Sequence, residues 1–189
     1  LAVVIALGVV TTTLDHRVAA QGKAAAQAPM FEVDPLWPKP LPNNWTLGNG
    51  IGIAVDSQDR VWMIHRTSGV DKNFTLPGGT CCTVAPAILG FDQAGNLIGH
   101  WGGPGQGYEW PDSNHGLWID FKGNFWVGGN GDKDTQVLKF TPDGKFLLQI
   151  GKHGVHNGSN DTANLWKATD GSVDKATNEV YIGDGYGNR

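Results

Sequence analysis

Charged side chains are scarce in this chain: Lys, Arg, Asp and Glu make up 17% of its 189 residues, and the formal net charge is −4. A mildly acidic chain lacks the basic surface with which proteins bind nucleic acid, so that class of function is excluded. Cysteine is nearly absent as well, with 2 residues in the whole chain. Two cysteines leave no second pair for a structural zinc–thiolate site.

The two cysteines, Cys81 and Cys82, are neighbours in the sequence. Thiols in an oxidising compartment usually pair, but adjacent cysteines can close only a strained ring. The sequence therefore leaves three alternatives open: a vicinal disulfide, two packed or loop thiols, and pairing with a cysteine beyond Arg189.

An apolar run at residues 1–10 is well short of the ~18–20 residues that a membrane-spanning helix needs. The small residues Val18-Ala19-Ala20 follow it. This order is typical of a signal peptide, here residues 1–20, and it predicts a secreted or periplasmic protein without a stable membrane span. A transmembrane anchor is the alternative. Because the chain begins with Leu1, we expect the basic start of the signal peptide upstream, and residues 21–46 are expected to form a disordered or extended lead-in.

Glycine and tryptophan are abundant instead, with 28 and 8 residues, beside 10 prolines. This combination favours short strands, tight turns and large side chains packed between sheets. One pattern recurs in residues 52–64, 116–128 and 168–183: an apolar strand ending in Asp, a polar turn, and a strand carrying an aromatic residue. The aspartates are Asp56, Asp120 and Asp174, and the aromatic residues are Trp62, Trp126 and Tyr181. A hairpin used repeatedly at this spacing is typical of a β-propeller.

The predicted fold class is therefore all-β, an incomplete β-propeller over residues 47–189. Blades take roughly 40–50 residues each, so the chain holds about two and a half of them, and we interpret it as part of a longer protein. We expect at least two complete four-stranded antiparallel blades within residues 47–151, with Trp62 and Trp126 in equivalent positions. An unclosed propeller exposes strand edges, so this segment alone should be unstable and inactive.

The repeats resemble NHL repeats, which implies a six-bladed NHL-type propeller. Three stretches are similar, in order and spacing, to peptidyl-α-hydroxyglycine α-amidating lyase: residues 61–66, 114–120 and 183–189. They contain His65-Arg66, His115-Gly116-Leu117 and Asp184-Gly185-Tyr186. The resemblance implies a zinc-dependent lyase that cleaves the C–N bond of a carbinolamide and gives an amide and glyoxylate.

His115 is the candidate metal ligand. It lies five residues before Asp120 at the start of the inner strand of blade two, where blades one and three carry Ile51 and Thr169. A histidine flanked by non-ligands suggests ligands from alternate blades that converge on one ion and leave a position open to substrate. The alternative is a hydrogen-bonded histidine at a strand start. By resemblance, His115 matches one of three zinc histidines, and the other two would lie beyond Arg189.

The resemblance also implies roles for other residues. Arg66 would hold the substrate carboxylate, because a guanidinium grips a carboxylate with two parallel hydrogen bonds. Tyr186 would be the catalytic base. The alternatives are a surface arginine at a loop start and an aromatic residue that lines the channel. A structural calcium in the family implies the backbone carbonyls of Ile53 and Leu117 as ligands, since carbonyl oxygens suit a hard ion.

The other histidines carry weaker signals. His153 and His156 have metal-like spacing, but they are expected to be solvated loop residues with no third ligand nearby. His65 is expected to pack inside the fold, because strand alternation points it away from Arg66.

Two rival functions stay open beside an enzyme that takes a small-molecule or peptide substrate in its channel. One is a non-catalytic exported NHL propeller that binds a protein or glycan on its top face. The other is a gluconolactonase-like calcium propeller hydrolase, which needs carboxylates and asparagines in the channel.

Overall fold

The structure, a computed structural model, describes residues 28–68, 70 and 82–188. The predicted signal peptide and the first part of the lead-in lie outside these residues, as does Cys81, whereas Cys82 is disulfide-bonded. Residues 28–34 belong to a first unit, Leu1–Asp34, and the sheets all belong to a second unit, Pro35–Arg189. Within the described ranges, no helix is long and apolar enough to cross a membrane.

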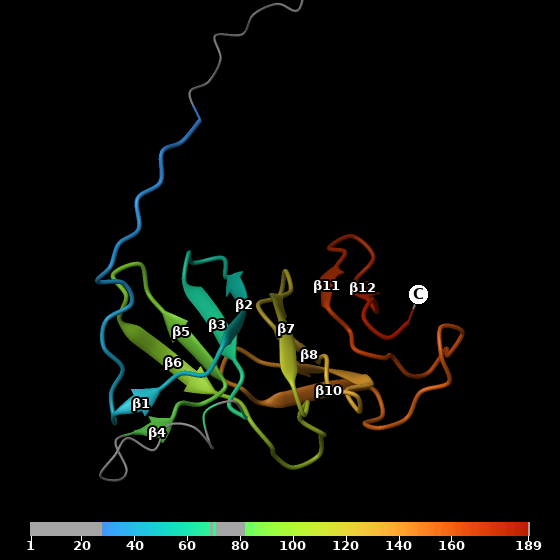
Figure 1. The fold of residues 1–189 in the computed structure, drawn as a ribbon. Coiled ribbons are helices and arrows are strands. Elements are labelled where there is room, and N and C mark those ends of the chain that lie inside the picture. The colour runs from blue at the N-terminus through green and yellow to red at the C-terminus, as the bar shows by residue number, and fades with distance from the viewer. Residues whose placement is uncertain (1–27, 69, 71–81, 189) are drawn as a thin grey trace, which may run out of the picture. The chain divides into compact units, whose positions relative to one another are not determined.

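Two complete four-stranded antiparallel blades make up most of the second unit, and a two-stranded hairpin follows them (Figure 1). Blade one has the strand order β2-β3-β5-β6, and blade two, read from its inner strand, has the order β7-β8-β9-β10. The strands of blade one are β2 (Gly50–Val55), β3 (Val61–His65), β5 (Ile88–Phe91) and β6 (Leu97–Trp101). Those of blade two are β7 (Asn114–Ile119), β8 (Phe125–Gly129), β9 (Gln136–Phe140) and β10 (Phe146–Gly151). The hairpin consists of β11 (Asp170–Val173) and β12 (Val180–Gly183). The all-β propeller-blade prediction is confirmed, with both complete blades inside residues 47–151.

The same hydrogen bond closes the repeat in both complete blades. Trp62 Nε1 donates to Asp56 Oδ2 at 2.9 Å, and Trp126 Nε1 donates to Asp120 Oδ2 at 3.1 Å. Each aspartate also accepts backbone N–H groups of its own turn, so one carboxylate sets the turn and orients the indole. The equivalence predicted for the two tryptophans is therefore confirmed. In the hairpin, Tyr181 donates to a glutamate instead.

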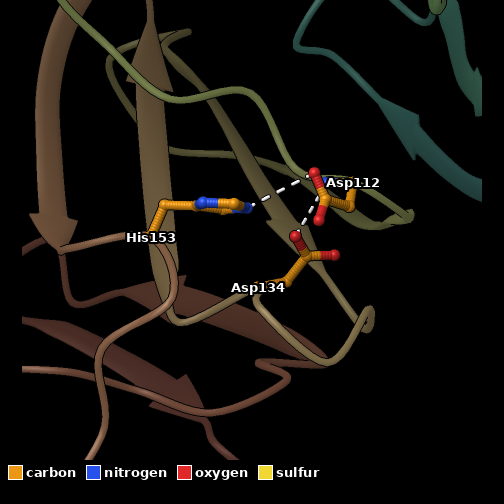
Figure 2. Close-up of side chains that lie close together, drawn as sticks. All are labelled: Asp112, Asp134 and His153. Atoms are coloured by element: carbon orange, nitrogen blue, oxygen red, sulfur yellow. Dashed lines mark hydrogen bonds and ion pairs between the residues drawn. The ribbon is translucent and has the colours of Figure 1, made fainter.

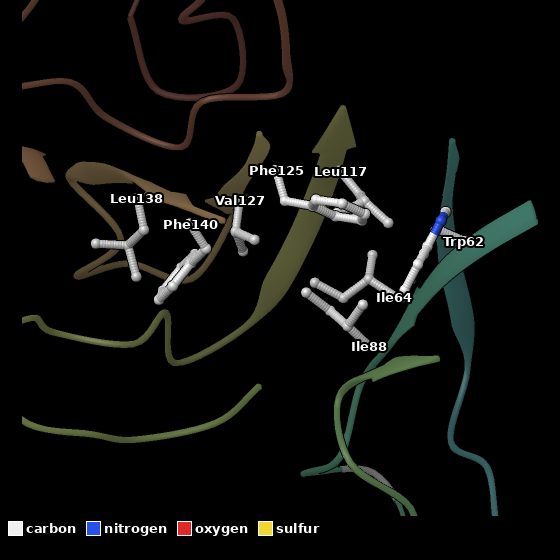
Figure 3. Close-up of a cluster of buried hydrophobic side chains, with 8 residues drawn as sticks. All are labelled: Trp62, Ile64, Ile88, Leu117, Phe125, Val127, Leu138 and Phe140. Atoms are coloured by element: carbon white, nitrogen blue, oxygen red, sulfur yellow. The ribbon is translucent and has the colours of Figure 1, made fainter. Parts of the chain in front are cut away.

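The main core lies between blades one and two (Figure 3). Eight buried side chains form it: Trp62, Ile64, Ile88, Leu117, Phe125, Val127, Leu138 and Phe140. The Trp62 and Phe125 rings meet edge to face, with centroids 4.8 Å apart. Full burial of such a side chain contributes about 1.5–3 kcal/mol, so this interface holds the two blades together.

The later part of the predicted lead-in packs onto blade one. Trp37 lies against Phe91, with ring centroids 5.7 Å apart, and the Lys39 N–H donates to the Gly95 carbonyl at 3.0 Å. The two-residue strands β1 (Trp45–Thr46) and β4 (Thr83–Val84) then pair in parallel. The apolar face of blade one opposite to blade two is covered by this segment.

Candidate functional site

The starts of the three inner strands surround one cavity of about 300 Å³. Ile51, His115 and Thr169, the three equivalent positions of the repeat, all line it, and Asp170 lies beside them. The pairing register of β2 shifts at Ile51, and that of β7 shifts between Asn114 and Leu117. Such bulges turn a side chain away from the regular pleat, which here presents the first residues of β2 and β7 to the cavity.

Glycines allow the inner strands to approach each other closely enough to form this cavity. A Cβ atom added to Gly52 would lie 3.0 Å from the carbonyl oxygen of His115. One added to Gly116 would lie 2.6 Å from the carbonyl oxygen of Thr169. The same contact thus recurs between successive blades, and only a residue without a Cβ accommodates it at Gly116.

His115 has both ring nitrogens free of backbone bonds. Its Nε2 lies 3.4 Å from the hydroxyl of Tyr186, and the two rings meet nearly at right angles, with centroids 5.2 Å apart. Its Nδ1 is buried without a hydrogen-bond partner among the residues that the structure describes. Tyr186 is 57% exposed, so the pair opens to solvent. Because this imidazole makes no hydrogen bond to the backbone of the described residues, it is available to bind a ligand.

His65 shows the opposite arrangement and confirms the expectation that it packs inside the fold. The side chain is fully buried; its Nδ1 accepts from the Gly48 N–H at 3.1 Å, and its Nε2 donates to the Pro86 carbonyl at 2.9 Å. Burial lowers the pKa of His65, although hydrogen bonds to backbone groups oppose this effect. The folded protein therefore holds His65 neutral.

A neutral buried histidine predicts a loss of stability in mild acid. The unfolded chain takes up a proton at His65 below its ordinary pKa of 6.5, while the folded chain resists protonation until a lower pH. The free energy of unfolding should therefore fall as the pH decreases from about 7.5 to about 5.5. Urea titrations across this range should show a weaker pH dependence in His65→Gln than in the parent protein. Equal slopes in the two proteins would contradict the assignment.

Arg66 lies at the same end of the blades as His115. Its Nη2 donates to Asn130 Oδ1 at 2.9 Å, and its Nε donates to the carbonyl of Asn114, the residue before His115, at 3.4 Å. The backbone N–H of Arg66 donates to Asn49 at 2.9 Å. Arg66 is half-buried and does not itself line the cavity. Tyr186 therefore contacts the imidazole of His115, whereas Arg66 contacts the backbone of the residue before it.

The remaining predicted site residues also lie at the cavity. Ile53 and Leu117 line it, the former 72% exposed and the latter buried. Sequence reasoning missed Asp170, whose exposed carboxylate lies beside Thr169 and accepts the N–H of Gly171 at 2.8 Å. Asp170 occupies the position that Gly52 and Gly116 occupy in the other two repeats. The replacement of glycine by aspartate in the third repeat was the sequence feature that could have identified it.

A second polar cluster joins the loop before blade two, the turn after β8 and the loop after β10 (Figure 2). Ligand atoms of Asp112, Asp134 and His153 all lie within 4.8 Å of one another, a grouping compatible with a cation. His153 Nε2 lies 3.3 Å from Asp112 Oδ1. The expectation that His153 is a solvated residue without a third ligand nearby is therefore wrong. His156 is not fully solvated either, since its ring stacks on Trp166.

Asp134 has a structural role in this cluster. Its carboxylate is fully buried and accepts three backbone N–H groups, from Asp112, Ser113 and Gly131, at 2.7–3.0 Å. These bonds satisfy both oxygens and fix the chain just before β7. The cluster was invisible in the sequence because its three members lie on separate segments.

Comparison with protein-family models found no match, and comparison with curated proteins found none. A solved structure that resembles this chain is a gluconolactonase from Xanthomonas campestris, described as important in glucose secondary metabolic pathways. The identity is 14%, the TM-score is 0.32, and the match covers 72% of this chain and 54% of that chain. The chain spans about half the length of that protein, and a likeness this weak says nothing about activity. The class of protein, an all-β chain built of propeller blades, follows from the sheets described above.

Proposed function

We propose that the protein is an exported, metal-dependent propeller enzyme that works as a lyase on α-hydroxyglycine-type carbinolamides. One observation carries the proposal. The three residues that the resemblance assigns to the reaction come from separate stretches of sequence, and Tyr186 and Arg66 each contact His115 or the residue before it. Tyr186 is within 3.4 Å of His115, and Arg66 bonds to the carbonyl of the residue before it.

The histidine fits a metal ligand, because neither of its ring nitrogens is used by the backbone of the described residues. His115 would hold zinc together with ligands from outside the described residues. A bound zinc ion supplies Lewis-acid polarisation of the substrate hydroxyl. The carbonyls of Ile53 and Leu117 are proposed as calcium ligands, supported by their place on the same cavity.

The protein's own residues would act on the substrate as follows. Arg66 binds the carboxylate and orients the carbinol carbon. Tyr186 acts as the general base and accepts the hydroxyl proton, a carbonyl forms at that carbon, and the C–N bond breaks with its electron pair on nitrogen. The nitrogen then takes up the proton that Tyr186 accepted. One carbinolamide therefore gives one amide and one glyoxylate, with no water consumed and no change of oxidation state.

The test is zinc content and turnover in the whole protein. We expect about one zinc per chain and release of glyoxylate from an N-acyl-α-hydroxyglycine. Replacing a residue that merely hydrogen-bonds a metal ligand lowers metal affinity or activity about 10–100-fold. Removing the ligand itself, in His115→Ala, should therefore lower activity by more than about 100-fold and release the zinc. His153→Ala, at the second cluster, is the matched control and should retain both. A metal-free, inactive parent protein would overturn the proposal and favour a non-catalytic propeller that binds a protein or glycan.

A second candidate is a calcium-dependent lactone hydrolase, which the carboxylate of Asp170 at the cavity favours. Hard cations prefer oxygen ligands, and this exposed carboxylate lies at the same cavity as the carbonyls proposed above as calcium ligands. Assays with a sugar lactone and a carbinolamide separate the two candidates. Calcium-dependent lactone hydrolysis that Asp170→Asn abolishes and His115→Ala leaves intact would favour the hydrolase.

A further inference from the structure

We propose that Asn130 is a positioning residue that aims the guanidinium of Arg66 without neutralising it, so that this site selects ligands carrying a free carboxylate. The inference rests on the proposed function for the identity of the substrate. The recognition of a carboxylate, however, is argued from the hydrogen bonds around Arg66.

The bonds of Arg66 leave one edge of its guanidinium free. The group carries five N–H donors in a rigid planar fork. Nε and Nη2 donate to Asn114 O and Asn130 Oδ1, which occupy one edge of the fork. Nη1 and the second hydrogen of Nη2 have no acceptor among the described residues. These two donors lie side by side, which is the geometry that takes up both oxygens of a carboxylate.

The hydrogen-bond acceptors of Arg66 do not pair its charge. Its acceptors are a backbone carbonyl and a side-chain amide, both neutral. In the described part of the chain, four ion pairs occur and none includes Arg66. A half-buried cation without a carboxylate partner attracts an anion more strongly than a paired one, because the site is partly shielded from water.

Asn130 is itself held in place. Its Oδ1 accepts a second hydrogen bond from the Ser113 hydroxyl at 2.9 Å, and its backbone N–H donates to the Ser113 carbonyl at 2.9 Å. Two donors converge on the same oxygen, which fixes the orientation of the amide. Asn130 follows β8 as Arg66 follows β3, so equivalent positions of neighbouring blades join here. The contact spans 64 positions in the sequence.

The side chain at position 130 is an amide rather than a carboxylate, and this difference separates a structural role of Asn130 from a role in carboxylate recognition. An aspartate at position 130 would keep the hydrogen bond to Arg66 and strengthen it, but would pair the charge. If Asn130 had only a structural role, Asn130→Asp would therefore be tolerated. If it preserves the charge for a ligand, the same substitution removes carboxylate recognition while the fold survives.

The experiment measures binding of N-benzoylglycine and its methyl ester to the whole protein by calorimetry. A free-energy change of about 1.4 kcal/mol corresponds to a tenfold change in affinity, and a hydrogen bond to a charged group contributes more than that. Arg66→Ala and Asn130→Asp should therefore each weaken binding of the acid at least about tenfold. Asn130→Ala should weaken binding of the acid less, because the charge of Arg66 remains and only the hydrogen bond that orients its guanidinium is lost. Binding of the ester should stay the same in all variants, and the thermal midpoint of Asn130→Asp should match the parent.

The outcomes separate this inference from the proposed function. A parent protein that does not bind the acid, or an Asn130→Asp variant that binds it like the parent, overturns the inference. Equal losses for acid and ester, with a lowered thermal midpoint, show that the substitution damages the fold rather than carboxylate recognition, and they also overturn the inference. Acid-selective loss in a protein that does not cleave carbinolamides supports the inference and removes the lyase. Cleavage that Asn130→Asp leaves unchanged retains the lyase and removes the inference.

Discussion

Replacing Asp120 with alanine should lower the free energy of unfolding by about 3–5 kcal/mol, the cost of removing one partner of a buried charge pair. The Asp120 side chain is 1% exposed. Its carboxylate accepts from Trp126 Nε1 at 3.1 Å and from Lys139 Nζ at 3.0 Å, and it also closes the β7–β8 turn. Alanine leaves the Lys139 ammonium and the Trp126 indole N–H without this acceptor beside the β7–β8 turn.

Urea unfolding of the parent, Asp120→Ala and Asp120→Asn measures this effect. Asparagine keeps the shape and some of the hydrogen bonds but loses the charge. The free energy of unfolding of Asp120→Asn should therefore lie between those of the parent and Asp120→Ala. Asp92→Ala is the control, because Asp92 closes an exposed outer turn with hydrogen bonds from Asn96, and its loss should cost much less. A loss at Asp120 no larger than that at Asp92 would contradict the buried role.

Acid unfolding provides a second measure of Asp120. Burial alone would raise its pKa, but hydrogen bonds from the Asn124 backbone, Lys139 and Trp126 outweigh burial and hold the pKa below the ordinary 3.8. A lowered pKa stabilises the fold above 3.8, and this stabilisation is lost as the pH falls through the folded-state pKa. The acid-induced loss of stability should therefore be smaller in Asp120→Asn than in the parent.

Gly116→Ala should disrupt the contact between blade two and the third hairpin. The new Cβ would lie 2.6 Å from the backbone oxygen of Thr169, and a backbone atom cannot move aside as a flexible side chain would. The two inner strands must separate, at a cost near the upper end of the ~1–3 kcal/mol typical of overpacking. Because His115 precedes this glycine, ligand binding at the cavity should weaken as well.

Gly185→Ala is the matched control. A Cβ there would meet Thr169 only at 3.8 Å, an ordinary van der Waals distance, so stability should change little. Thermal unfolding of both variants, together with zinc content, measures the two effects. A Gly116→Ala protein that unfolds at the parent's midpoint and keeps its metal would show that the strands have room for a side chain.

The repeated hairpin was predictable because its determinants are local. Asp56 and Trp62 lie six positions apart, and the turn between them brings the carboxylate to the indole whatever the rest of the chain does. The same spacing in Asp120 and Trp126 gives the same bond. Turn chemistry and strand alternation therefore determined the blades and the equivalence of Ile51, His115 and Thr169 from the sequence alone.

Only the tertiary structure decided which side chains meet. Tyr186 reaches His115 across 71 positions and Arg66 reaches Asn130 across 64, and no local pattern encodes such distances. The resemblance named three of these residues but not Asn130, and the pairing of His153 with Asp112 went unforeseen. The contacts of Tyr186 with His115 and of Arg66 with Asn130 join neighbouring blades, so they depend on how closely the blades pack, as at Gly52 and Gly116. The sequence by itself determined the blade, and the packing of one blade on the next determined the site.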